Sequence, residues 1–411
     1  MTTTILKASR SGRVALFAVW TVMMSSVIWN TGVPVSAQEA SQAQVIPSAD
    51  DSDLSLKLEI QNAIRKGARW LLTHQEQEGH WSDPDHPALT SFALFALMND
   101  PVRTAKGDQY SPVISNGYAY LQRKVRPDGG IYTDGVGLAN YNTSVSIMAL
   151  TAAGNPEYDT LIRNARSFVI KGQFDFDEKG ELDHPLDGGI GYGNSYPHSD
   201  LSNTVLALEA LRFSEAWKPE NPALGEEELN WEAAIKFISN CQNLKGANTQ
   251  SWVSEDPANK GGFVYFPGNT KSETVELPDG RVALRSYGSI SYAGLLSFAY
   301  ARLDPTDQRV AAVKQWLSEN YTLEENPGMD QQGLFYYYHT MAKALTAARV
   351  QSLTTVDSRT VNWRKDLALK LLDLQNLNGS WSNETARWWE KDPVLVTSYC
   401  LIALELIEQA L

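Results

Sequence analysis

The sequence predicts an all-α protein in which residues 54–411 form a single (α/α)6 toroid of six helix–Gly-rich turn–helix repeats. Each repeat has an amphipathic helix followed by a helix that is apolar on nearly every side, as expected for an outer and an inner helix. The first and last repeats share the turn Gln-x3-Gly-x-Trp, at Gln75–Trp81 and Gln375–Trp381, which is expected if ring closure makes them neighbours. An open α-solenoid is the alternative, although solenoids usually end in atypical polar caps.

The repeats follow one another with the same three parts. Outer helices are expected at residues 60–75, 113–122, 161–173, 230–242, 310–321 and 363–375. The turns are expected at 78–81, 128–132, 187–193, 260–268, 331–338 and 378–381. Inner helices are expected at 88–98, 142–154, 201–212, 289–303, 339–349 and 394–407. The fifth turn, "QQGLFYYY", is the poorest copy. The insert Asn269–Arg281 contains a "PDG" turn signal and predicts a hairpin or a lid over the central cavity.

Composition limits the class of protein and its partners. Of the 411 residues 43% are hydrophobic, which supports a large core and excludes general disorder. The net charge of −13 argues against nucleic acid as a partner, because binding to phosphates needs a basic surface. The sequence indicates no oligomeric state.

The N-terminus has the pattern of a signal peptide at residues 1–37, followed by a polar linker at 38–53. Lys7, Arg10 and Arg13 precede the apolar stretch Val14–Trp29, and small residues end at Ala37. An uncleaved membrane anchor is the alternative. Cleavage would remove three positive and no negative charges, so the net charge would change from −13 to −16. No later segment is long and apolar enough to span a bilayer. The sequence therefore predicts an exported protein, periplasmic or secreted, with no transmembrane span after cleavage.

The two cysteines, Cys241 and Cys400, lie within apolar helical patterns. Export permits a disulfide, but this placement favours two buried free thiols. Two cysteines cannot form a cysteine-rich metal cluster, and the sequence implies neither a cofactor nor a metal.

The repeated turns and the Gly-Gly-aromatic segments resemble the terpenoid cyclase and protein prenyltransferase toroid superfamily. The turn is most similar to that of squalene–hopene cyclases, and the single ring to prenyltransferase β-subunits. In those cyclases the turn is structural. The resemblance therefore implies that Gln75 and Gln375 bond backbone groups at a helix end and pack on Trp81 and Trp381. Free backbone groups at helix ends need such partners.

The resemblance also implies two kinds of chemistry, and neither set of residues is complete. Squalene-type cyclases protonate an alkene with Asp-x-Asp-Asp, where Asp200 matches but the acid falls on Ser202 and its neighbour on Asn203. Prenyltransferases bind zinc with Asp, Cys and His, which fall on Arg285, Tyr287 and His339. One ligand of three remains, so no zinc site is expected.

Polar and aromatic residues are expected where the inner helices begin, around the mouth of a central cavity. The catalytic candidates are Asp200, His339, Arg285 and Tyr287: His339 as a base with a carboxylate partner, and Arg285 as a carboxylate-binding group. A structural histidine and a salt-bridged arginine are the alternatives. The binding candidates are Asp85, His86, Tyr141, His198, Trp388 and Trp389, with Asn142, Tyr196 and Asp392 beside them. Aromatic rings suit isoprenoid chains, carbocations and stacked sugars.

These observations predict a protein that binds or processes a hydrophobic, isoprenoid-like small molecule in its central cavity. Whether it is an enzyme stays open, because the known catalytic residues of the similar families are missing. A glycan-active lyase or hydrolase on the same toroid is one alternative, and a non-catalytic interaction scaffold is another.

Overall fold

The computed structural model describes residues 51–101, 103, 110–193, 196–218, 228–277 and 280–411. The predicted signal peptide (1–37) and all but the last three residues of the predicted linker lie outside the described residues. Those last three residues belong to the first helix, which therefore begins nine residues before the predicted start at Ile60. Within the described part, the chain is mostly helical with two short antiparallel strand pairs, which confirms the all-α prediction.

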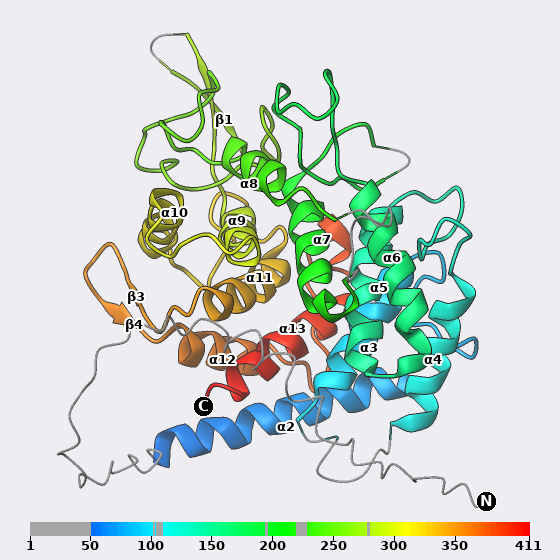
Figure 1. The fold of residues 1–411 in the computed structure, drawn as a ribbon. Coiled ribbons are helices and arrows are strands. Elements are labelled where there is room, and N and C mark those ends of the chain that lie inside the picture. Colours follow the sequence, from blue (N-terminus) through cyan, green and yellow to red (C-terminus); the bar gives the residue numbers. More distant parts are fainter. Residues whose placement is uncertain (1–50, 102, 104–109, 194–195, 219–227, 278–279) are drawn as a thin grey trace, which may run out of the picture. The chain divides into compact units, whose positions relative to one another are not determined.

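Six buried helices form an inner ring (Figure 1). Their sequences are apolar or small on nearly every side, so each is buried around most of its circumference. Each packs against the next in the order α3, α5, α7, α9, α11, α13, and α13 packs against α3. The inner helices therefore close on themselves, as expected for a ring and not for an open solenoid. They are α3 (Pro87–Asn99), α5 (Ala139–Ala153), α7 (Leu201–Phe213), α9 (Gly288–Tyr300), α11 (Leu334–Ala347) and α13 (Pro393–Glu408).

The amphipathic helices lie outside this ring. α4 packs on α3, α6 on α5 and α7, α8 and α10 on α9, and α12 on α13. The first helix, α2, contacts both α12 and α13, so the two ends of the helical array lie side by side (Figure 1). The outer helices are α2 (Asp51–Thr73), α4 (Ser111–Arg123), α6 (Asp159–Lys171), α8 (Trp231–Asn240), α10 (Gln308–Glu319) and α12 (Trp363–Asp373), with single 3-10 turns η2 (Pro156–Tyr158), η3 (Glu215–Trp217) and η5 (Arg387–Trp389).

The two strand pairs are hairpins between helices. β1 (Thr274–Glu276) pairs with β2 (Val282–Leu284), so the insert that precedes α9 forms a hairpin, as predicted. β3 (Leu353–Thr354) pairs with β4 (Thr360–Val361) between α11 and α12. The second hairpin was not expected, because its strands are only two residues long.

The shared turns connect one outer helix to the next. Nε2 of Gln75 donates to the backbone oxygens of Gly79 (3.0 Å) and Val113 (2.8 Å), the latter at the start of α4. Nε2 of Gln375 donates in the same way to Gly379 (2.9 Å) and to Ala63 of α2 (3.0 Å). The last turn therefore bonds the first helix, and the scaffold interpretation of these glutamines agrees with the structure.

The tryptophans of these turns are fully buried and tie each turn to the outer helix before it. Nε1 of Trp81 donates to the backbone oxygen of Leu71 (2.8 Å), and Nε1 of Trp381 donates to Leu371 (2.8 Å). Gln173 and Gln242 make the same two-carbonyl bridges in the third and fourth repeats. The sequence comparison missed these two because no Gly-x-Trp follows them at the same spacing.

The fifth repeat corrects one prediction. Residues 334–338 of the expected turn belong to α11, which begins five residues before His339. The helix can begin there because Gly333 adopts a left-handed φ of 65° and the buried carboxylate of Glu390 accepts from the backbone N–H groups of Phe335 and Tyr336. A carboxylate at a helix N-terminus satisfies donors that have no partner within the helix.

Cys241 and Cys400 are free and buried, as predicted. Across the described ranges, none of the helices combines the length and the apolar character needed to cross a bilayer.

Candidate functional site

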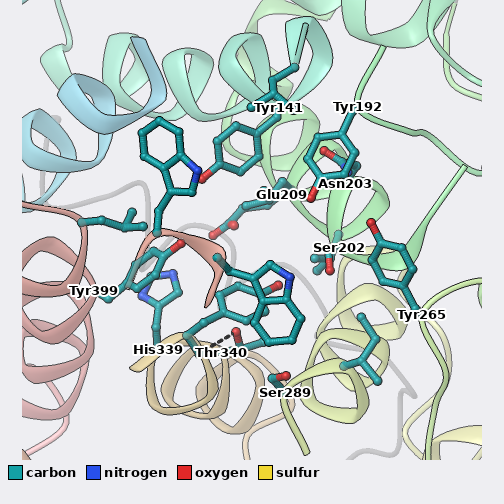
Figure 2. Close-up of a pocket in the computed structure, with 18 of the residues that line it drawn as sticks. Tyr141, Tyr192, Ser202, Asn203, Glu209, Tyr265, Ser289, His339, Thr340 and Tyr399 are labelled. Carbon is teal, nitrogen blue, oxygen red and sulfur yellow. Dashed lines mark hydrogen bonds between the residues drawn. The ribbon is translucent and has the colours of Figure 1, made fainter. Parts of the chain in front are cut away.

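A cavity of ≈ 430 Å³ lies inside the ring of inner helices (Figure 2). All six inner helices contribute, mostly from their N-terminal halves, and Glu209, Leu296 and Lys343 lie further along α7, α9 and α11. The first turns form the mouth, and residues one to two turns further along form the walls and the floor. The lining comprises His86, Leu89, Phe92, Leu138, Tyr141, Tyr192, Tyr196, His198, Ser202, Asn203, Val205, Leu206, Glu209, Tyr265, Lys271, Tyr287, Ser289, Ile290, Leu296, Tyr336, His339, Thr340, Lys343, Trp388, Trp389, Leu395 and Tyr399.

Most of the predicted candidates line this cavity. Of the catalytic candidates, His339 and Tyr287 do, and Asp200 and Arg285 do not. The binding candidates in the lining are His86, Tyr141, His198, Trp388 and Trp389, and Tyr196 joins them. The structure therefore brings together side chains from all six repeats, which are far apart in the sequence.

Asp200 is fully buried behind the lining because it caps α7. Its Oδ1 accepts from the backbone N–H of Asn203 (2.9 Å), and its Oδ2 accepts from Nδ2 of the same residue (2.7 Å). Burial raises the pKa of Asp200 to about 7, while hydrogen bonds from Asn203 and Tyr265 and the charge of Lys271 oppose this rise. Its carboxyl group therefore serves the helix and does not face the cavity.

Asp85 and Arg285 lie outside the lining for local reasons. Asp85 is exposed in the loop before α3, where its backbone N–H bonds the side chain of Asp83 (2.8 Å). Arg285 follows β2, and its backbone continues the hairpin through Glu273 (3.1 Å) and Thr270 (2.8 Å). Arg285 therefore does not join His339 and Tyr287 in the cavity lining.

Two other mouth candidates cap helices. Asn142 accepts from the backbone N–H of Ala88 at the start of α3 (3.0 Å). Asp392 caps α13 through Val394 (2.8 Å), and its other oxygen accepts from Ser82. Both carboxamide and carboxylate groups are common at such positions, so these roles are structural.

The walls of the cavity are aromatic. Figure 2 shows Tyr141, Tyr399 and His339 directed toward a common space on one side, with Tyr192 and Tyr265 on the other. His339 stacks on Tyr399 with ring centroids 4.6 Å apart. Burial raises the pKa of each of these tyrosines, so their hydroxyls stay protonated and act as hydrogen-bond donors at neutral pH.

The floor is charged and was not predicted. The carboxylate of Glu209 on α7 pairs with Nζ of Lys343 on α11, and the hydroxyl of Tyr300 donates to the same carboxylate (3.0 Å). Glu209 and Lys343 are 1% and 4% exposed. A sequence signal existed for both, because each is a charged residue flanked by apolar or small residues in the middle of an inner-helix segment. Such residues are rarely buried without a partner.

The mouth is bordered by two strained tryptophans. Trp388 and Trp389 have left-handed φ values of 55° and 68°, which bulky residues rarely adopt. Trp389 contacts the ring of His86 edge-on with centroids 4.5 Å apart. Glu390, which follows the pair, is anchored at the start of α11, so the strain is held by a buried contact. Backbone strain of this kind is concentrated at binding and catalytic sites.

The hairpin insert contributes one cation to the cavity. Nζ of Lys271 lies 4.2 Å from the ring centroid of Tyr265, which is a cation–π geometry. Burial lowers the pKa of Lys271, and Asp200 opposes the change. In the described ranges, no three His, Cys, Asp or Glu side chains are grouped so that they could hold a metal ion.

Comparison with known proteins gives similarity in structure only. No protein-family model and no curated sequence matches the chain. A variant of the type II terpene cyclase MstE from Scytonema, solved with geranylgeranyl dihydroxybenzoate as substrate, is 12% identical, with a TM-score of 0.51 over 87% of this chain and 100% of that chain. A D-mannose isomerase is 13% identical, with a TM-score of 0.53 over 89% of this chain and 100% of that chain.

Identities this low carry the fold and no chemistry, and the two similar proteins have different activities by their names. The helical ring, the buried turns and the structural similarity agree with one another. The protein has a terpenoid cyclase-like fold.

Proposed function

We propose that the protein binds a hydrophobic, isoprenoid-like small molecule in the central cavity and does not cyclise it by protonation. The observation that carries this proposal is the cavity of ≈ 430 Å³ with aromatic walls at the centre of the ring. Its volume lies within the range of roughly 300–1,000 Å³ of small-molecule pockets. The fold that it shares with a terpene cyclase supports the class of ligand.

The absence of cyclisation is inferred from the residues at the start of α7. Ser202 and Asn203 line the cavity, and by the resemblance to squalene-type cyclases the acid and its neighbour would fall on these two positions. Neither side chain can donate a proton to an alkene. Asp200 has a raised pKa but lies behind the lining with both carboxyl oxygens bonded to Asn203. A proton donor must reach the reacting atom, so Asp200 is not placed for this role.

Native mass spectrometry of the purified protein with farnesol tests the binding. Leu206→Trp, which fills the cavity wall, is expected to abolish the complex, and Leu369→Trp on the exposed face of α12 is the matched control. Trp389→Ala at the mouth is expected to weaken binding roughly tenfold, as loss of an aromatic contact does, and Leu377→Ala on the surface is its control. Unchanged binding in both cavity variants would contradict the proposal.

A sugar is the second candidate ligand. The paired tryptophans at the mouth favour it, because exposed aromatic faces suit the stacking of sugar rings, and a D-mannose isomerase shares the fold. The same measurement with D-mannose and D-fructose in place of farnesol decides between the two. The sugar would replace the isoprenoid as the proposed ligand if the protein forms a complex with D-mannose or D-fructose but none with farnesol. The variant Trp389→Ala should then abolish the sugar complex.

We also propose that the protein works outside the cytoplasm, in the periplasm or as a secreted protein, after removal of residues 1–37. The basic, apolar and small-residue pattern of that segment supports this location.

A further inference from the structure

The floor of the cavity connects two helices that are not neighbours in the ring. Glu209 belongs to α7 and Lys343 to α11, and α9 lies between these helices in the order of packing. Tyr300, at the end of α9, donates to the same carboxylate. Figure 2 shows the Glu209 carboxylate directed into the space that Tyr141 and His339 border. A charge pair therefore closes the inner end of a cavity whose walls are mostly aromatic and aliphatic.

Lys343 has unused hydrogen-bonding capacity at this floor. An ammonium group has three N–H donors, and among the described residues only Glu209 accepts one of them. Both residues line the cavity, so the remaining donors have the cavity as their open side. A buried donor without a partner destabilises the folded protein, and an oxygen atom of a bound molecule would offset this cost.

His339 is a second, independent sign of a polar ligand group. It lies one helical turn before Lys343, is buried, lines the cavity, and its Nδ1 has no hydrogen-bond partner in the described part of the chain. Burial and the charge of Lys343 hold the pKa of His339 well below its usual range, so the ring is neutral. The stack on Tyr399 and the edge contact with Phe92 fix its orientation. A neutral imidazole offers one donor and one acceptor.

A purely structural floor would not need these residues. Replacing a buried ion pair with apolar side chains of similar volume is often neutral or stabilising, so closing the cavity alone does not require a charge pair. The Glu209–Lys343 pair also disfavours a charged group on the ligand. Glu209 already neutralises Lys343, and a ligand carboxylate would lie beside the carboxylate of Glu209 and an uncharged imidazole.

We propose that the inner end of the ligand carries an uncharged oxygen group, a hydroxyl or a carbonyl, which accepts a hydrogen bond from Nζ of Lys343 and bonds the imidazole of His339. This inference rests on the proposed binding of an isoprenoid-like molecule and specifies its class as an oxygenated one. The aromatic walls contact the hydrocarbon chain, and the floor distinguishes the oxygenated end from a hydrocarbon end.

The test compares three probes of the same chain length: farnesene, farnesol and farnesal. The protein is expected to bind farnesol or farnesal at least tenfold more tightly than farnesene. In the double variant Glu209→Leu/Lys343→Met this preference is expected to disappear, with farnesene bound as tightly as before or more tightly. The exposed pair Glu324 and Lys370, changed to Leu and Met, is the matched control and is expected to keep the preference.

His339→Phe keeps the charge pair and provides a second variant if the double variant does not fold. This variant is expected to weaken the binding of farnesol. If the affinity falls for farnesol but not for farnesal, the ligand group is a hydroxyl that donates to His339. Equal affinity for all three probes in the unchanged protein, or equal losses for all three in both variants, would overturn the inference and leave the proposed binding intact. Absence of binding for all three would instead refute the proposed function.

Discussion

Single residues in the turns show why their spacing is strict. Gly79 has a φ of 90°, and a Cβ atom at this position would lie 2.4 Å from the backbone oxygen of Asn116 in α4. Gly379 has a φ of 96°, and its Cβ would lie 2.6 Å from the backbone oxygen of Lys66 in α2. Only glycine fits such a backbone and such a close approach. The turn residues therefore hold successive outer helices in close contact.

Gly79→Ala is expected to lower the midpoint of thermal unfolding strongly. Two destabilising effects add together: alanine is strained at a left-handed φ, and its Cβ would clash with the backbone of Asn116. Gly246→Ala is the matched control, since Gly246 has a φ of 91° and nothing within 4 Å of the added Cβ. The control is expected to cost only about 1 kcal/mol for the left-handed conformation. Equal shifts in the two variants, measured by differential scanning calorimetry, would contradict a role for the close approach to Asn116.

Aromatic and histidine candidates could be found from the sequence because they precede or begin the inner helices. His86, Tyr141, His198 and Trp388 are such residues, and all four line the cavity. Asp200 also begins an inner helix but turns back onto its first turn. The identity of the residue does not distinguish a cap from a ligand contact, and only the side-chain direction does.

At the scale of elements, two inner helices begin at buried carboxylates. Asp200 caps α7 within its own segment, and Glu390 caps α11 from a distant loop. Burial raises the pKa of each carboxyl group to about 7. The cap of α7 immediately precedes its helix in the sequence, whereas the cap of α11 comes from a loop more than fifty residues away, and for that reason the start of α11 was predicted incorrectly.

The raised pKa of Asp200 predicts a pH dependence of stability. Between pH 4 and pH 7 the unfolded chain loses this proton while the folded protein keeps it. The free energy of unfolding therefore falls as pH rises through this window, by on the order of a few kcal/mol. Asp200→Asn, which retains a good capping group, is expected to show a smaller fall between pH 5 and pH 8 in thermal unfolding.

Asn362→Ala is the control for this experiment, because it removes a cap from α12 that does not titrate. It is expected to lower stability equally at both pH values. A fall with pH that is the same in Asp200→Asn and in the unchanged protein would contradict the assignment of this proton to Asp200.

At the scale of the whole molecule, ring closure unites the first and last repeats. Gln375 bonds α2, and Nε2 of Gln61 donates to Glu408 near the end of α13 (2.7 Å). The inner helices all begin at the mouth, so their first turns place residues of distant repeats around one cavity. This arrangement makes a single pocket from a repeated sequence.

The proposed export predicts the mass of the mature protein. When the full chain is produced in a host with a secretion pathway, the exported protein is expected to begin at Gln38. Intact-mass measurement of the extracytoplasmic fraction checks this start. Replacing Ala37 with Arg is the matched variant, because a large charged residue at the cleavage site is expected to block processing. Recovery of the uncleaved chain in the membrane fraction would instead support the anchor alternative.

The sequence by itself determined the helical class, the repeat and the aromatic residues before the inner helices, and the scaffold role of the turns was implied by the resemblance to the cyclases. These features depend on local periodicity and on spacing within one repeat, which are readable along the chain. Only the tertiary structure decided which side chains reach the cavity. The pairing of Glu209 with Lys343 and the distant cap of α11 by Glu390 depend on contacts between segments far apart in the sequence. The direction of the Asp200 side chain is a local matter, but the residue type alone does not decide between a helix cap and a ligand contact.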